Sequence, residues 1–178
     1  MLNNKRKFNL RKVVMKNKVS IKKALYAGSF DPFTNGHLDI VKRSLKVFDE
    51  LYIVVAISPT KNPLFSDDDR VDVLKAIFKD YDNIFVHSWD GLTVDFATKH
   101  EVTHMVRGLR PTGDFEGEFQ MASMNNTLAS KVESVFFMTG EEHFFISSSL
   151  VREVFGHGGG ISKFLPKEGF SFLNGKKR

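Results

Sequence analysis

The stretch ALYAGSFDPFTNGH, residues 24–37, runs from an apolar strand through a glycine-broken turn to a histidine that begins an amphipathic helix. Gly28 allows backbone to approach a ligand closely, and the exposed N–H groups at a helix start favour negative charge. Ser29 adds a hydroxyl to this loop, and His37 adds a donor that the protein can tune. Together these groups suit a phosphate chain, because they can stabilise charge on a phosphoryl group without a protein nucleophile. The loop therefore predicts nucleotidyl transfer.

Apolar runs alternate with helical patterns along the rest of the chain. We expect strands at 24–28, 51–57, 83–87, 103–107 and 134–138. We expect helices after His37, after the cap at Ser66, and at 93–100, 114–130 and 148–155. Strands separated by helices indicate parallel pairing through right-handed crossovers. The predicted fold is α/β and Rossmann-like, with a doubly wound five-stranded parallel sheet and helices on both faces.

The net charge of +5 is concentrated at the start of the chain. Residues 1–14 hold five Lys or Arg and no Asp or Glu, so the remainder is formally neutral. We predict a flexible basic extension at 1–23 and a single nucleotidyltransferase domain at 24–178. The domain itself carries no charge excess to follow a nucleic-acid backbone, and we expect no nucleic-acid partner.

Composition narrows the class of protein further. No apolar run reaches the roughly 18 residues that would span a bilayer, so we expect no membrane segment and no membrane partner. The chain has no cysteine, which excludes disulfides, thiolate metal sites and a cysteine nucleophile. A reducing compartment fits this composition, and we expect a cytoplasmic protein.

Candidate ligand residues follow each predicted strand, where the carboxyl ends of a parallel sheet form a ligand crevice. In chain order they are Ser29 and His37, Lys61, Leu92 and Thr93, Arg107 and Arg110, and Ser147, Ser148 and Ser149. Lysine supplies a compact positive charge, whereas arginine grips phosphate through two parallel N–H groups. The three serines open a helix, where hydroxyls and backbone N–H groups suit departing phosphates.

Five short strings occur in an order that is selective for one family: YAGSFDP at 26–32, TNGH at 34–37, RGLR at 107–110, DFE at 114–116 and ISSSLVR at 146–152. With them the chain resembles the bacterial phosphopantetheine adenylyltransferases from residue 24 to about residue 166. A lone T-x-G-H string would identify only the wider nucleotidyltransferase superfamily. The resemblance implies transfer of AMP from ATP to 4′-phosphopantetheine, giving dephospho-coenzyme A and pyrophosphate, with Mg²⁺ and in a homohexamer.

The resemblance also implies roles for individual residues. The catalytic residues would be His37, Lys61 and Arg107, with His37 on the α-phosphate. The ATP contacts would be Ser29, Phe30, His37, Gly108, Leu109, Arg110, Glu118, His143, Phe144, Phe145, Ile146, Ser147, Ser148 and Ser149. The 4′-phosphopantetheine contacts would be Ser29, Lys61, Thr93 and Arg107.

The chemistry of this reaction suits such a residue set. The acceptor brings its own nucleophile as a phosphate oxygen that is mostly dianionic near neutral pH, so no strong general base is needed. Magnesium keeps several waters and would be held chiefly by the ATP phosphates, so we assign no metal ligand.

Three positions depart from the family pattern. Ala27 stands where proline is common, Gly117 where tyrosine is frequent, and His143 where an aromatic residue often lies near adenine. These departures concern adenine packing and nucleotide affinity, and none removes a charged catalytic group.

Two alternatives remain open. A related enzyme for another phosphorylated acceptor, such as nicotinate mononucleotide, would keep the His37 loop but change the acceptor contacts, and the RGLR string argues against it. A noncatalytic nucleotide-binding module is also compatible with this fold. The joint presence of His37, Lys61, Arg107 and the serines argues against that module.

Overall fold

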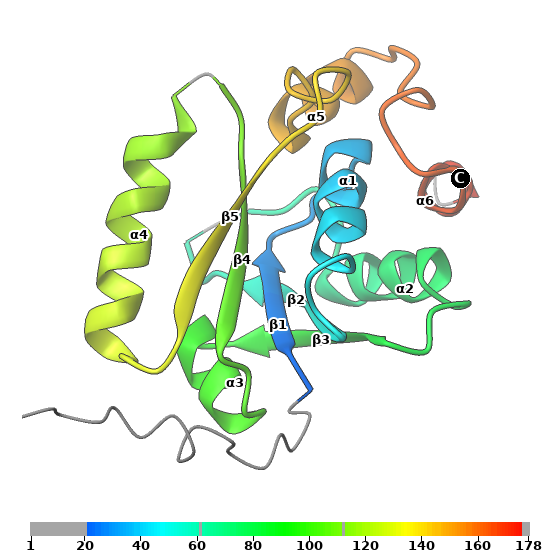
Figure 1. The fold of residues 1–178 in the computed structure, drawn as a ribbon. Helices are drawn as coiled ribbons and strands as arrows, with labels where there is room; N and C mark the ends of the chain where they lie inside the picture. Colours follow the sequence, from blue (N-terminus) through cyan, green and yellow to red (C-terminus); the bar gives the residue numbers. More distant parts are fainter. Residues whose placement is uncertain (1–20, 61, 112, 176–178) are drawn as a thin grey trace, which may run out of the picture.

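Five parallel strands form one sheet at the centre of the protein (Figure 1). The structure is a computed structural model and describes residues 21–60, 62–111 and 113–175. The strands are β1 (Lys23–Gly28), β2 (Glu50–Ile57), β3 (Ile84–Asp90), β4 (His104–Leu109) and β5 (Glu133–Met138). Each begins one residue from its predicted start, and the predicted parallel sheet is confirmed. β1 already begins at Lys23, the last residue assigned to the basic extension, whose residues 1–20 lie outside the described residues.

The winding of the sheet reverses at β1. The strand order is β3-β2-β1-β4-β5, so the chain moves outward on one side of β1 and then returns to build the other side. β1 pairs with β2 from Lys23 to Gly28 and with β4 from Ala24 to Tyr26. In doubly wound sheets, ligands bind outside the carboxyl ends of the strands at such a reversal.

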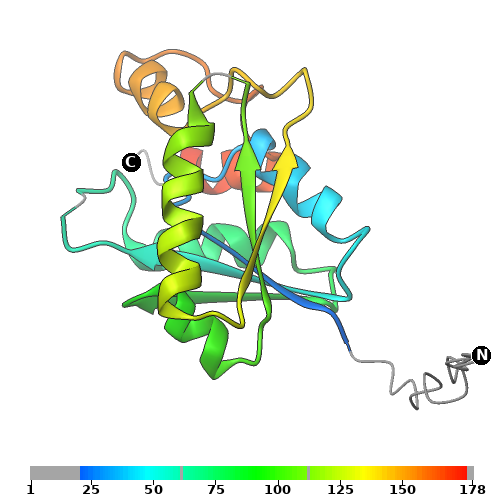
Figure 2. The ribbon, with the colours of Figure 1, turned by 60° about the vertical axis from the view of Figure 1, so that its left-hand side comes forward.

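Helices cover both faces of the sheet, as predicted. α1 (Asn35–Ser44) and α2 (Asp67–Ile77) lie on one face, and α3 (Thr93–Lys99) and α4 (Asp114–Leu128) on the other (Figure 1). Because successive strand residues point to opposite faces, Tyr26 joins the core beneath α1 and α2, whereas Leu25 packs in the core that contains Phe96 of α3. α5 (Ser148–Gly156) lies beyond the carboxyl ends of β4 and β5 (Figure 2).

A sixth helix, α6 (Lys167–Gly175), was not predicted. It packs on α2, where a Cβ added at Gly169 would lie 3.5 Å from both Val73 and Ile77. Leu173 of α6 belongs to an apolar cluster that also contains Val151 of α5. The C-terminal segment therefore links α2 to α5 and supports the helix that carries the serine string.

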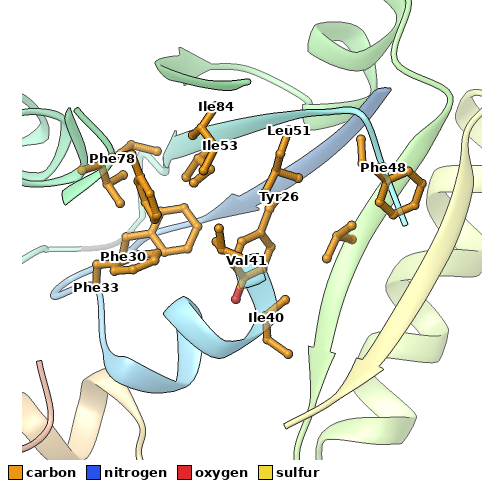
Figure 3. Packing of buried hydrophobic residues seen from close by; sticks show 14 residues of the cluster. Tyr26, Phe30, Phe33, Ile40, Val41, Phe48, Leu51, Ile53, Phe78 and Ile84 are labelled. Atoms are coloured by element: carbon orange, nitrogen blue, oxygen red, sulfur yellow. The ribbon is translucent and has the colours of Figure 1, made fainter. Parts of the chain in front are cut away.

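An aromatic cluster connects the sheet to the loop after β1 (Figure 3). Tyr26, Phe30 and Phe33 follow one another with ring centroids 5.3 and 5.4 Å apart, and Phe33 meets Phe78, the C-cap residue of α2, edge to face at 5.6 Å. Phe30 and Phe33 are 3% and 1% exposed, although both belong to a connecting loop. This packing fixes the β1–α1 loop on the core.

α4 differs from the other helices because it has no single apolar face. Phe115, Phe119, Met121, Met124 and Leu128 are all more than half exposed. The rings of Phe115 and Phe119 stack with centroids 6.0 Å apart. Within the described ranges, no helix has the length and apolar character needed to cross a membrane.

Candidate active site

A cleft of about 570 Å³ opens at the carboxyl ends of β1 and β4, where the winding reverses. It gathers segments that are far apart in the sequence: the β1–α1 loop, the start of α3, the end of β4, the inner side of α4 and the start of α5. The predicted site residues in its wall are Ser29, Phe30, His37, Thr93, Arg107, Gly108, Arg110, Glu118, Ile146, Ser147, Ser148 and Ser149. A second hollow of about 530 Å³ adjoins it and shares Ser29, Ser148 and Ser149.

His37 is the third residue of α1 and forms a capping box with Thr34. The Thr34 hydroxyl accepts a hydrogen bond from the His37 N–H at 3.4 Å, and the Thr34 backbone N–H donates to His37 Nδ1 at 2.9 Å. Because Nδ1 is an acceptor, the neutral ring carries its proton on Nε2. Burial, assisted by the charge of Arg110, lowers the pKa of His37 to about 4. His37 is therefore an uncharged donor fixed in one tautomer.

The loop before His37 is shaped by the ring of Phe30. Phe30 has φ 48°, in the left-handed region that non-glycine residues seldom adopt. Its ring packs against Tyr26, Phe33 and His37 at 5.3 to 5.4 Å between centroids. A Cβ at Gly28 would lie 3.0 Å from this ring, so glycine makes room for Phe30 as well as lining the cleft. Backbone strain and aromatic packing together set the path of the loop.

Both arginines of the RGLR string are held by carboxylates of α4. Arg107 donates through Nε and Nη2 to the two oxygens of Glu118 at 2.5 and 2.6 Å, and through Nη1 to the Ala27 carbonyl at 3.1 Å. Arg110 donates through Nε and Nη2 to Asp114 at 2.6 and 2.9 Å. Asp114 and Glu118 lie one helical turn apart, so a single face of α4 fixes both guanidinium groups.

These pairs set the charge state of the cleft. Burial alone would lower the pKa of Arg107, but the hydrogen bonds and charge of Glu118 outweigh it and raise that pKa. The hydrogen bonds between Arg110 and Asp114 raise the pKa of the arginine and lower that of the carboxyl. Since Arg107 uses three of its five N–H groups on protein oxygens, two remain to meet a phosphate in a fixed direction.

The three serines mark the start of α5, as predicted. Ser147 is the N-cap, and its hydroxyl accepts from the backbone N–H three residues later at 3.1 Å. The Ser148 hydroxyl donates to the Pro32 carbonyl at 2.9 Å, and the Ser149 hydroxyl accepts from Arg152 at 3.3 Å. The hydroxyls thus fix α5 against the β1–α1 loop, and the N–H groups of a first helical turn can receive an anion.

Thr93 is the first residue of α3 and lines the cleft. The turn before it is closed by Trp89, whose Nε1–H donates to the Leu92 carbonyl at 3.0 Å. The Lys99 ammonium lies 5.2 Å from the centre of the Trp89 ring. Trp89 is partly buried and is the single tryptophan of the chain.

Some predicted nucleotide contacts are not part of the cleft wall. Among the residues that the structure describes, its wall does not include Leu109, His143, Phe144 or Phe145. Leu109 is buried in β4, whereas Phe144 and Phe145 are 40% and 54% exposed. These assignments stay predictions, and Lys61 falls outside the described residues.

The cleft also contains residues that the sequence analysis did not assign, namely Tyr26, Thr34 and Asn125. Burial raises the pKa of Tyr26, which keeps its phenol protonated. Asn125 is 7% exposed and follows Glu118 by two helical turns, so helix periodicity alone places it on the same side of α4. Thr34 belongs to the TNGH string, and its residue type could have identified it as the N-cap of α1.

Comparison with known proteins agrees with this geometry. Residues 25–154 match the family model described as cytidylyltransferase-like. Three similar proteins are each named phosphopantetheine adenylyltransferase. The one from Lachnoclostridium phytofermentans is 47% identical over 146 residues, covering 82% of this chain and 90% of the relative. Those from Campylobacter hominis and Syntrophotalea carbinolica are 45% and 47% identical, covering 86% and 80% of this chain and 96% and 86% of the relatives. The chain therefore belongs to the phosphopantetheine adenylyltransferase family of cytidylyltransferase-like proteins.

Proposed function

We propose that this chain transfers AMP from ATP to 4′-phosphopantetheine, giving dephospho-coenzyme A and pyrophosphate in coenzyme A synthesis. The observation that carries this proposal is the convergence of one neutral imidazole donor, two carboxylate-held guanidinium groups and a serine-capped helix start on one cleft. The names of the three relatives supply the acceptor.

In the proposed reaction, a phosphate oxygen of the acceptor attacks the α-phosphorus of ATP. The new P–O bond forms as the bond to the β-phosphate breaks, and pyrophosphate leaves with the electron pair. No proton transfer is required, because the acceptor phosphate is mostly dianionic near neutral pH. The protein has to bring two polyanions together and stabilise the charge on the transferred group.

Each group in the cleft has a proposed part in this step. The Nε2–H of His37 would donate to an α-phosphate oxygen, which gains charge in the transition state. Arg107 would hold the acceptor phosphate through its two remaining N–H groups, and the start of α5 would receive the β- and γ-phosphates. Thr93 would contact the pantetheine arm through its backbone. Lys61 would add a second positive charge on the acceptor, and that role rests on the sequence alone.

Magnesium would enter bound to the phosphates of ATP, as part of that substrate. Within the described ranges, no three His, Asp or Glu residues form a group that could hold a metal ion. The carboxylates nearest the cleft, Asp114 and Glu118, are each paired with an arginine. Phosphate oxygens and water are the ligands that Mg²⁺ takes in such sites.

We further propose a cytoplasmic homohexamer. The exposed apolar side chains of α4 support self-association, because apolar patches of this kind on a folded surface mark interaction sites. Light scattering coupled to size exclusion would measure the mass of the particle. A monomer at micromolar concentration would rule out the assembly without touching the proposed reaction.

A pyrophosphate-release assay tests the proposed function. Wild-type protein with MgATP should turn over with 4′-phosphopantetheine and not with nicotinate mononucleotide. His37→Ala should lower kcat by about 10² to 10³, the value of one preorganised donor, and leave the acceptor KM nearly unchanged. His157→Ala removes an exposed imidazole and serves as the matched control. Turnover with nicotinate mononucleotide alone would refute the proposed function, and an unaltered kcat in His37→Ala would refute the role given to His37.

A further inference from the structure

The carboxylate of Asp31 joins two loops of the site and has no part in the proposed mechanism. Asp31 is 3% exposed and lies in the β1–α1 loop between Phe30 and Pro32. Its Oδ2 accepts the backbone N–H of Leu64 at 2.9 Å, and its Oδ1 accepts that of Phe65 at 3.0 Å. Both donors belong to the loop between β2 and α2. A buried carboxylate is costly unless its oxygens are satisfied, and here two adjacent amides satisfy them.

The same two loops are tied a second time by Arg70 of α2, whose side chain is 4% exposed. Arg70 donates through Nη1 to the Ser29 carbonyl at 2.6 Å and through Nε to the Phe65 carbonyl at 3.1 Å. The Asp31 carboxylate in the β1–α1 loop therefore accepts hydrogen bonds from backbone amides of the β2–α2 loop. The Arg70 guanidinium on α2 donates to backbone carbonyls of both loops. The relative position of the loops is set by four hydrogen bonds of opposite polarity.

Asp31 also contacts the other side of the cleft. Arg152 of α5 donates to the Asp31 carbonyl at 2.5 Å and approaches its carboxylate at 3.4 Å. Asn62, Pro63 and Asp31 line the second hollow together with Ser149 and Arg152. The contacts of Asp31 therefore lie in the wall of a space that is continuous with the candidate active site through shared residues.

We propose that Asp31 is a positioning residue for the acceptor side of the reaction, fixing segment 62–65 against the β1–α1 loop that leads into His37. This inference rests on the proposed function. Segment 62–65 directly follows Lys61 in the chain, the residue that the sequence predicts to bind the acceptor. Arg152 reaches the Asp31 backbone carbonyl as well as its side chain, so a side-chain change loosens segment 62–65 more than it loosens α5.

Asp31→Asn tests the proposal because the amide has almost the same shape but only one acceptor oxygen. Its NH₂ group would face a backbone N–H, so one of the two loop contacts is lost. We expect the KM for 4′-phosphopantetheine to rise about tenfold or more, while the KM for ATP changes by less than about twofold. KM does not depend on the amount of active enzyme, so a loss of folded material alone changes neither KM. Rates would be normalised to folded protein so that kcat can also be compared.

Asp49→Asn is the matched control. Asp49 accepts the Lys22 backbone N–H at 2.8 Å, the same type of contact, at the end of the sheet opposite to the cleft. Its two KM values should equal those of wild type. An unchanged acceptor KM in folded Asp31→Asn, or an equal rise in both KM values, would overturn the positioning role.

Amide exchange of the wild-type protein supplies a second measurement if Asp31→Asn does not fold. The Leu64 and Phe65 amides should exchange about 10² times more slowly than in an unfolded chain. Added 4′-phosphopantetheine should slow them further, and ATP alone should leave them unchanged. Unprotected amides, or no response to the acceptor in a protein that turns over, would overturn the proposal. A wild-type protein without turnover would instead refute the proposed function, and the protection of these amides would still show whether Asp31 holds the segment.

Discussion

Acidification should destabilise this protein through His37. The ring has an ordinary pKa of 6.5, which the folded structure lowers to about 4 because burial removes the ring from water and Arg110 adds a nearby positive charge. At a pH between these two pKa values, His37 is protonated in the unfolded chain and unprotonated in the folded protein. The stabilisation is therefore complete above pH 6.5 and is lost as the pH falls toward 4.

The size of the loss follows from the two pKa values. One pKa unit corresponds to about 1.4 kcal/mol, so a shift from 6.5 to about 4 amounts to about 3.5 kcal/mol of unfolding free energy. Relative to pH 7.5, linkage gives a loss of about 1.4 kcal/mol at pH 5.5 and about 2.5 kcal/mol at pH 4.5. Such a change is a large fraction of the unfolding free energy of an ordinary domain, which is only about 5–15 kcal/mol.

Urea unfolding of wild type and His37→Gln at these three pH values measures this loss. All other side chains are the same in both proteins, so the difference between the two free energies isolates His37. Wild type should lose its advantage over the variant as the pH falls, whereas His157→Gln should track wild type, because that imidazole is exposed. A difference that stays constant with pH would refute the reasoning. So would ring-nitrogen NMR shifts that place the proton of His37 on Nδ1.

Three further substitutions test other contacts. Arg107→Met should weaken acceptor binding by about 1.5–3 kcal/mol, the value of a charged hydrogen bond, and acceptor titrations would measure this loss. Adding Glu118→Gln should recover the stability of the fold but not the acceptor affinity. Gly108→Ala should lower the unfolding free energy by about 1–3 kcal/mol in denaturant unfolding, because its Cβ would lie 3.0 Å from the buried Ile40 side chain. Adding Ile40→Val should recover part of this loss. If the losses of the two single variants simply add in the double variant, the clash is contradicted. Ser147→Ala should cost about 1 kcal/mol as a lost N-cap, and unchanged thermal unfolding would count against that cap.

The sheet was predictable because its strands are short apolar runs separated by helical patterns. Ser66 and Ser147 mark helix starts with a side-chain oxygen, a local signal that needs no knowledge of tertiary structure. α6 was missed because the surface that it covers belongs to α2, almost a hundred residues earlier in the chain. Its stability depends on that packing rather than on a local signal.

The candidate site was predictable in its residue types and less so in their pairings. The sequence indicated Arg107 and Glu118 as separate substrate contacts, whereas the structure joins them in one bidentate pair between β4 and α4. Asp31 belongs to the YAGSFDP string, but the partners of its carboxylate in the β2–α2 loop are more than thirty residues away in the sequence. Such contacts depend on which loops the winding of the sheet brings together, and side-chain chemistry alone does not supply that information.

Trp89 gives the protein an intrinsic optical probe. Its indole closes the turn that precedes Thr93, and no second tryptophan adds background emission. Any ligand that disturbs this turn will change the indole environment and hence the fluorescence of the unlabelled chain. Titrations with each substrate can thus be followed without a chromophore attached near the cleft.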